Sequence, residues 1–146
     1  MALKRTQADK WFSDCVRQRN NYTCELCETY YPPSASRGGL HTSHYFTRAN
    51  YSVRHYPDNA FCLCWGCHQK LGSNPHDHRE FVMNKLGQGR YEKLLVLRND
   101  NSIGKCVKKQ EKQISKHYRE EFRAMERERE DNGNTGYLDF EPYINE

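Results

Sequence analysis

The sequence predicts a small α+β fold, in which two short strands and a helix are held by a structural metal ion and further helices are added at both ends. Two Cys-x-x-Cys pairs, Cys24/Cys27 and Cys64/Cys67, can supply four thiolates to one ion. Two stretches between these pairs have strand character. Apolar residues at helical spacing occur before and after this region. These three observations indicate one zinc-stapled domain with helical additions.

Composition excludes several classes of protein. The chain has 146 residues, 36% of them hydrophobic, and a mean hydropathy of −1.09. It contains no apolar run of membrane-spanning length and no apolar stretch of a signal peptide after Met1, so we expect a cytoplasmic protein without a membrane partner. All 23 basic residues precede residue 131, against 15 of the 19 acids, which gives residues 1–130 a net charge of +8 and favours an anionic partner.

The N-terminal half predicts one helix and two strands. Thr6 and Asp9 have the spacing of a helix-capping pair, and the helix ends near Asn20. A loop with one cysteine pair and several Pro, Ser and Gly residues covers 22–40. A strand is predicted over 41–51, a turn over 56–59 and a second strand over 60–63.

The C-terminal half is predicted to be helical. Short helices are expected over 65–71, from Pro75 past Leu86, and around 91–97, with Gly87 and Gly89 separating the last two. Residues 105–130 lack Gly and Pro and carry a narrow apolar seam, which predicts one long helix. The predicted divisions are a zinc-stabilised domain with its N-terminal helix (1–98), a long C-terminal helix (99–130) and a flexible acidic tail (131–146).

The cysteine pairs predict a structural zinc site. Four thiolates close the coordination shell of zinc and leave no open position for chemistry. The alternatives are a redox Cys-x-x-Cys or core thiols without a metal. Cys15, Cys62 and Cys106 stand alone and are expected to be buried small hydrophobes.

A second pattern lies between the cysteine pairs. His44, Asn59 and His68 follow one another at spacings of 15 and 9 residues, on a predicted strand, turn and helix. This pattern resembles the ββα-metal hairpin of HNH nucleases, in which these side chains surround one divalent ion. Phosphodiester hydrolysis needs a base that activates water and a cation that stabilises charge. The resemblance implies that His44 is the base, that His68 holds magnesium or manganese, and that Asn59 positions His44 through hydrogen bonds to the backbone.

The second ligand of that ion is less well defined by the sequence. Many HNH sites have an acid or His directly before the base, where this chain has Ser43, a poor ligand for a divalent cation. His41, three residues before the base, is the alternative ligand. His76 and His78 follow a helix cap and are also near enough in sequence to be considered.

Over about residues 8–125 the order of features is similar to that of the phage NinG (Rap) recombination endonucleases. The matching segments are 8–12, the first cysteine pair, 41–46, 54–59, 64–68, 72–74 and 117–122. In that family an acid usually lies three residues before the base, a place that His41 takes here, and Asn often stands where this chain has His68. The resemblance implies phage recombination in the bacterial host cytoplasm and a preference for branched DNA such as D-loops and Holliday junctions. The rival interpretations are a nicking or packaging HNH enzyme and a zinc-dependent DNA-binding module without catalysis.

Basic residues flank the predicted site and are candidates for contacts with DNA phosphates. They include Arg37, Arg48, Arg54, Lys70 and Arg79. The alternative is an ordinary solvated basic surface. The mixed-charge helix over 105–130 is expected either to dock on the domain or to pair with a second copy as a homodimer.

Overall fold

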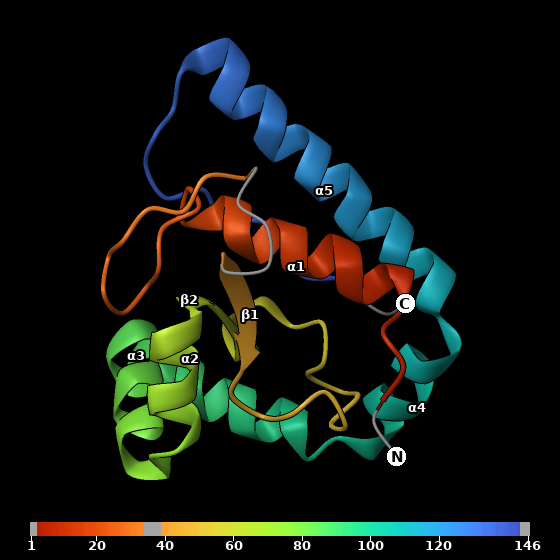
Figure 1. Cartoon of the computed structure of the whole chain (residues 1–146). Helices are drawn as coiled ribbons and strands as arrows, with labels where there is room; N and C mark the ends of the chain where they lie inside the picture. The colour runs from red at the N-terminus through yellow and green to blue at the C-terminus, as the bar shows by residue number, and fades with distance from the viewer. Residues whose placement is uncertain (1–2, 34–38, 144–146) are drawn as a thin grey trace.

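The computed structural model describes residues 3–33 and 39–143 as five helices, one two-stranded sheet and connecting loops (Figure 1). In chain order the elements are α1 (Gln7–Arg19), β1 (Leu40–His44), the 3-10 helix η1 (Pro57–Asn59), β2 (Ala60–Cys64), α2 (Trp65–Gly72), α3 (Pro75–Arg98), α4 (Asn101–Lys109) and α5 (Glu111–Asn132). The predicted α+β class with added terminal helices is confirmed at this level. No helix of the described residues is long and apolar enough to cross a bilayer.

The small sheet lies between two helical layers. β1 pairs with β2 in antiparallel register, from Leu40 opposite Cys64 to His44 opposite Ala60. Figure 1 shows α1 between the sheet and α5, with α2 and α3 beyond the sheet. Two apolar cores result, one beneath α1 and α5 and the other beneath β2, α2 and α3. Because β2 is buried along its whole length, it contributes to both cores.

α1 begins and ends where the sequence predicts. The Thr6 hydroxyl accepts a hydrogen bond from Asp9 N, and the Asp9 carboxylate accepts one from Thr6 N, which satisfies two orphan donors of the first turn. Ala8, Phe12 and Val16 are fully or almost fully buried against α5 and the sheet. Asn20 is the C-terminal cap. Because α1 is packed between α5 and the sheet, the polar residues on its sheet-facing side are held in place.

β1 is shorter than predicted. The strand ends at His44, whereas the sequence indicated an extended segment as far as residue 51. Beyond His44, the N–H and C=O of Phe46 bind the Asn59 side chain instead of a partner strand. The chain then turns back through residues 45–56, which we call the hairpin loop. The hairpin loop carries Arg48 and Arg54 past the end of the sheet.

The helices of the C-terminal half are divided differently from the prediction. The two segments expected between residues 75 and 97 form one element, α3, with a kink at Gly87, whose φ of 78° suits glycine. The single helix expected over 105–130 is wrong, because the chain breaks at Gln110 into α4 and α5. Asp100 caps the start of α4 by accepting hydrogen bonds from Ser102 N and Ile103 N. Figure 1 shows the two helices with different axes, although Val107 of α4 packs against the same core cluster as the seam of α5.

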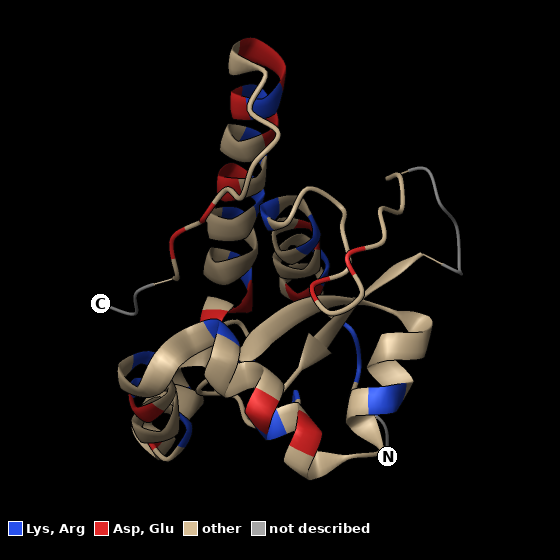
Figure 2. Ribbon diagram, turned by 90° about the vertical axis from the view of Figure 1, so that its left-hand side faces the viewer, with Lys and Arg blue, Asp and Glu red and all other residues tan. Residues whose placement is uncertain are grey.

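The predicted flexible tail is wrong for residues 133–143. After Gly133 the chain returns along α5 and α1, as Figure 2 shows. Leu138 N donates to Arg19 O over 2.9 Å, and Phe140 is 6% exposed in the core, beside Phe12. The negative charge of this segment lies on its exposed residues, while Phe140 fills the core between the helices.

The apolar seam of α5 is also used within the chain. Ile114, Tyr118, Phe122 and Met125 are buried, and they belong to the same core cluster as the apolar face of α1. The remaining faces of α5 carry both signs of charge (Figure 2). The seam is therefore covered within the chain, which is the docking alternative of the sequence analysis.

Candidate functional site

The four cysteines of the two pairs converge at one point, on the side of the sheet that faces α2. Their sulfur atoms all lie within 4.8 Å of one another, and Cys27 Sγ and Cys64 Sγ are 3.8 Å apart. Tetrahedral zinc with Zn–S bonds of about 2.3 Å would place its sulfurs about 3.8 Å from each other. The sulfurs are too far apart for a disulfide, whose S–S bond is about 2.05 Å. The donor set and its spacing fit one structural zinc ion.

Hydrogen bonds from nearby backbone and hydroxyl groups favour the thiolate form of two of these cysteines. Cys64 N donates to Cys24 Sγ over 3.4 Å, which stabilises thiolate character at that sulfur. The Thr29 hydroxyl and backbone lower the pKa of the Cys27 thiol to about 6. Cys15 and Cys62 are fully buried outside the cluster, as expected of small hydrophobes, whereas Cys106 is half-buried. The cluster therefore consists of the four predicted cysteines and no others.

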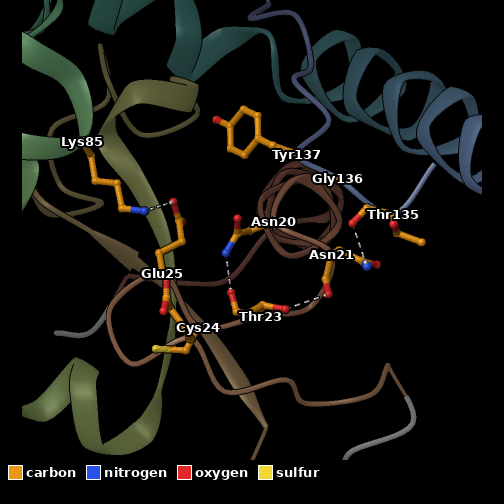
Figure 3. A pocket seen from close by; sticks show the side chains of 10 residues that line it. Asn20, Asn21, Thr23, Cys24, Glu25, Lys85, Thr135, Gly136 and Tyr137 are labelled. Atoms are coloured by element: carbon orange, nitrogen blue, oxygen red, sulfur yellow. Dashed lines mark hydrogen bonds and ion pairs between the residues drawn. The ribbon is translucent and has the colours of Figure 1, made fainter.

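Glu25 connects the first cysteine pair to the rest of the fold. Its backbone N donates to Cys62 O, and its carboxylate accepts from Cys62 N over 2.7 Å. Arg19 and Lys85 each lie 3.7 Å from this buried carboxylate, and Figure 3 shows Lys85 reaching it beside Cys24. Since β2 leads directly into the second cysteine pair, these contacts hold the two halves of the zinc cluster in register.

A polar cleft of about 340 Å³ opens between α1, β1 and α2. His41 and His44 of β1 and His68 of α2 line it, so the structure brings together the three histidines that the sequence singled out. The His41 and His68 rings are neighbours in the cleft, with centroids 5.6 Å apart and ring planes inclined by 49°. Burial and the nearby His41 lower the pKa of His68, which favours the neutral imidazole that binds metals. Ser43 is buried, and it is not among the residues that line the cleft.

His44 is held in one orientation at the end of β1. Its Nε2–H donates to the carbonyl oxygen of Arg54 over 2.9 Å, because a carbonyl can only accept. Nδ1 is then the unprotonated nitrogen that can accept a proton. Burial is the main cause that lowers the pKa of His44 to about 4, while the hydrogen bond to Arg54 acts in the opposite direction. The ring is therefore neutral at pH 7.

Asn59 makes the backbone hydrogen bonds that the sequence led us to expect. The side chain is fully buried; Nδ2 donates to Phe46 O and Val53 O, and Oδ1 accepts from Phe46 N over 2.8 Å. Asn59 O also accepts from Tyr45 N. Because these bonds join both ends of the hairpin loop, Asn59 fixes the loop that supplies the hydrogen-bond partner of His44.

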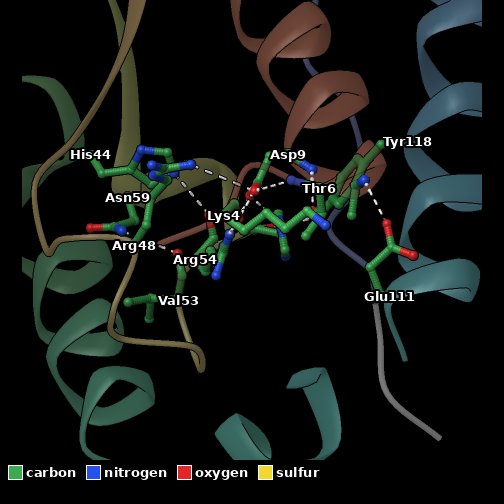
Figure 4. Close-up of polar contacts among 12 residues, drawn as sticks. Lys4, Thr6, Asp9, His44, Arg48, Val53, Arg54, Asn59, Glu111 and Tyr118 are labelled. Carbon is green, nitrogen blue, oxygen red and sulfur yellow. Dashed lines mark hydrogen bonds and ion pairs between the residues drawn. The ribbon is translucent and has the colours of Figure 1, made fainter. Parts of the chain in front are cut away.

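Asp9 is a site residue that the sequence analysis missed. Its carboxylate is buried; it accepts from Arg54 over 2.6 and 3.0 Å and from His55 over 2.8 Å, and Arg48 lies 3.6 Å away (Figure 4). Burial opposes ionisation, but the hydrogen bonds from His55 and Arg54 outweigh it and hold the pKa of Asp9 well below its usual range. Asp9 is therefore both the helix cap that the sequence predicts and the anchor of the hairpin loop.

Arg54 is consequently not a DNA-binding residue. Only 2% of its side chain is exposed, and its guanidinium binds Asp9 and the Lys4 carbonyl, so it cannot reach a phosphate. Among the other predicted cations, Arg48 lines the cleft, while Lys70 of α2 and Arg79 of α3 are exposed outside it. Arg37 lies outside the described residues.

α1 and the segment before it contribute further polar groups to the cleft. Asp9, Ser13 and Arg17 follow one another at four-residue steps on the side of α1 that faces β1, and Arg5 precedes the helix. A polar stripe beside the apolar face of α1 was the available signal in the sequence. Sequence reasoning followed only the apolar face, so these groups were not assigned to the site.

Comparisons with known proteins place the chain in a family. No curated protein and no solved structure matched the chain. The family model described as bacteriophage lambda NinG protein matches residues 4–128, which include the zinc cluster, the histidine cleft and most of α5. The chain belongs to the bacteriophage lambda NinG protein family.

Proposed function

We propose that this NinG family protein is a metal-dependent DNA endonuclease of the HNH type that hydrolyses phosphodiester bonds in phage recombination. The observation that carries the proposal is the convergence of His41, His44 and His68 on one cleft, with His44 oriented by a backbone carbonyl. A neutral imidazole with Nδ1 unprotonated can act as a base, and two neighbouring imidazoles can help to hold a cation.

His41 and His68 fit the role of holding the divalent cation. They lie on different elements, β1 and α2, yet their ring centroids are only 5.6 Å apart in the cleft. Magnesium and manganese favour oxygen ligands, so water and the substrate phosphate would supply the remaining ligands of the ion. When bound, magnesium or manganese would stabilise the negative charge that develops on the phosphate and the leaving oxygen.

His44 would remove a proton from the attacking water. Nδ1 accepts this proton, and the hydrogen bond from Nε2–H to the Arg54 carbonyl stabilises the imidazolium that forms. Asn59 and Asp9 act on the reaction only through position, because they fix the hairpin loop that carries Arg54. They are positioning residues in this proposal.

The cleft also offers cations to the DNA backbone. Arg5, Arg17 and Arg48 line it together with the histidines. Arg17 is paired with Asp14, and Arg48 lies near Asp9, so Arg5 is the cation of this group with the fewest competing contacts in the described residues. These groups recognise phosphates rather than bases, which supports shape-selective binding. The preference for D-loops and Holliday junctions is inferred from the family.

The test uses the zinc-loaded full chain with Mg²⁺ or Mn²⁺ and a labelled four-way junction. We expect His44→Ala to reduce the cleavage rate by about 10²- to 10⁴-fold, the usual contribution of a general base. DNA affinity and zinc content should remain unchanged. His76→Ala, which removes an exposed histidine at the start of α3, is the matched control and should cleave normally. Equal rates for His44→Ala and the wild type would refute the assigned base.

The substrate preference is measured separately with the wild-type protein. Faster cleavage of the four-way junction than of a linear duplex of equal length supports a branch-specific enzyme. Equal rates on both substrates would instead indicate the rival nicking or packaging enzyme. Binding of both DNAs without cleavage under any divalent ion would indicate a zinc-dependent binding module.

A further inference from the structure

A second groove lies on the opposite side of the hairpin loop from the histidine cleft. Its volume is about 410 Å³, and it is formed by the loop, the end of α3 and α4. Three cations line it: Arg98, Lys105 and Lys108. We propose that this groove, which we call the α4 groove, binds the phosphate backbone of a second arm of branched DNA while the first arm occupies the histidine cleft. This inference rests on the proposed function.

In the described part of the chain the cations of the α4 groove are not neutralised by acids, and Arg98 also lies over the Phe46 ring, 4.8 Å from its centre. Within residues 3–33 and 39–143, none of the three forms an ion pair with an acidic side chain. The acid that lines the groove, Asp100, is occupied at the start of α4, where it accepts from Ser102 N, Ser102 Oγ and Ile103 N. The groove therefore presents a net positive charge toward solvent, which suits an anionic polymer.

The groove also has the polar and aromatic lining that nucleic acid uses. Tyr51 lies on the loop side, with Lys108 Nζ 5.3 Å from its ring centre. Asn50 and Asn101 supply amide groups on opposite walls. The loop side is fixed to α3 because Ser52 Oγ donates to Arg98 O over 3.1 Å. A preformed, fixed wall beside lysines on a short helix is typical of a backbone-binding surface rather than of a base-reading one.

The hairpin loop connects the α4 groove to the proposed reaction. Arg48 lines the cleft, whereas the next four residues, 49–52, line the groove. The Arg54 guanidinium lies 5.0 Å from the ring centre of Tyr51, and the Arg54 carbonyl is the partner of His44. The cleft is otherwise built from α1, β1 and α2, and the groove from α3 and α4. In branched DNA two arms diverge from one point, so one arm can lie in the histidine cleft and the other in the α4 groove, on the two sides of this loop. A linear duplex has one axis and occupies only one of these sides.

The test measures binding of the full chain to a labelled four-way junction and to a linear duplex, without added divalent ion, over a range of salt concentrations. The variant is the double substitution Lys105→Gln/Lys108→Gln. The control is Lys112→Gln/Lys116→Gln, which removes the same charge from exposed positions of α5. Because each neutralised phosphate contributes about 0.9 to the slope of log K against log salt, loss of two contacts should reduce the junction slope by about 2.

We expect that reduction for the junction only, with the duplex slope unchanged and the control equal to wild type on both DNAs. Arg98→Gln should reduce the junction slope by about 1. An unchanged junction slope in the Lys105→Gln/Lys108→Gln variant would overturn the proposal. An equal reduction for junction and duplex would also overturn it, because the groove would then bind any DNA. Because this test measures binding and not cleavage, its outcome does not depend on whether the protein is a nuclease.

Discussion

Asp9→Asn is the substitution that most sharply tests the polar anchor of the hairpin loop. The change keeps the size of the side chain and removes the negative charge that faces Arg54 and His55. Arg54, 2% exposed, would be left with a buried charge and no acidic partner. Removal of one partner of a buried ion pair costs about 3 to 5 kcal/mol of unfolding free energy. The Asn oxygen still accepts hydrogen bonds, so we expect a loss near 3 kcal/mol.

This loss is large enough to measure by urea denaturation. With a slope of about 2 kcal/mol per molar urea for a small domain, the midpoint should fall by about 1.5 M. Asp14→Asn is the matched control, because Asp14 lies on the same helix and forms two ion pairs nearer the surface, with Lys10 and Arg17. Pairs of that kind contribute about 1 kcal/mol or less.

The comparison has one outcome that refutes the reasoning. If Asp9→Asn and Asp14→Asn lower the unfolding free energy by the same amount, Asp9 is not the buried anchor of the loop. The pH dependence gives an independent check, because the lowered pKa of Asp9 stabilises the fold above the ordinary carboxyl range. That contribution is lost as the pH falls toward the folded-state pKa, and it should be missing in Asp9→Asn.

Three further predictions concern the zinc cluster, the cleft and the tail. Cys64→Ser should lose bound zinc and cooperative unfolding, measured by metal analysis and circular dichroism, while Cys106→Ser should retain both; a folded, zinc-free Cys64→Ser protein would contradict the cluster. Folding lowers the pKa of His44 from 6.5 to about 4, so between these pH values the unfolded state is protonated and the folded state is not. The unfolding free energy should therefore fall by about 3 kcal/mol as the pH drops from 6.5 to 4. His44→Phe should remove that part of the pH dependence, and an unchanged profile would argue against the burial of the ring. Phe140→Ala should cost about 3 kcal/mol in the same denaturation assay, whereas the exposed Tyr137→Ala should cost much less, and equal values would show that the tail does not pack in the core.

The parts of the site that the sequence could predict are those encoded by spacing. Two Cys-x-x-Cys pairs are sufficient to predict a shared ion, and the spacing of His44, Asn59 and His68 was sufficient to place them at the end of β1, in η1 and in α2, although residues 45–51 belong to the hairpin loop and not to the predicted strand. The bonds of Asn59 across the loop were predictable for the same reason, because an amide in a turn has backbone groups on both sides.

The parts that could not be predicted depend on contacts between distant segments. Arg54 and Asp9 are 45 residues apart, and nothing in the local sequence of Arg54 distinguishes a buried arginine from an exposed one. Phe140 follows a Gly-rich break in an acidic segment, a composition typical of disorder, yet its ring fills the gap between α1 and α5, and Leu138 and Tyr143 pack against the same core.

The central claim is that the histidine cleft is a metal-dependent hydrolytic site. Its most direct test is the rate of junction cleavage measured against Mg²⁺ or Mn²⁺ concentration, for the zinc-loaded wild type, His41→Ala and His68→Ala. We predict saturable cleavage by the wild type and, for both variants, a more than tenfold rise in the ion concentration needed, with the structural zinc retained. No cleavage by the wild type at any ion concentration, or three identical curves, would contradict the account.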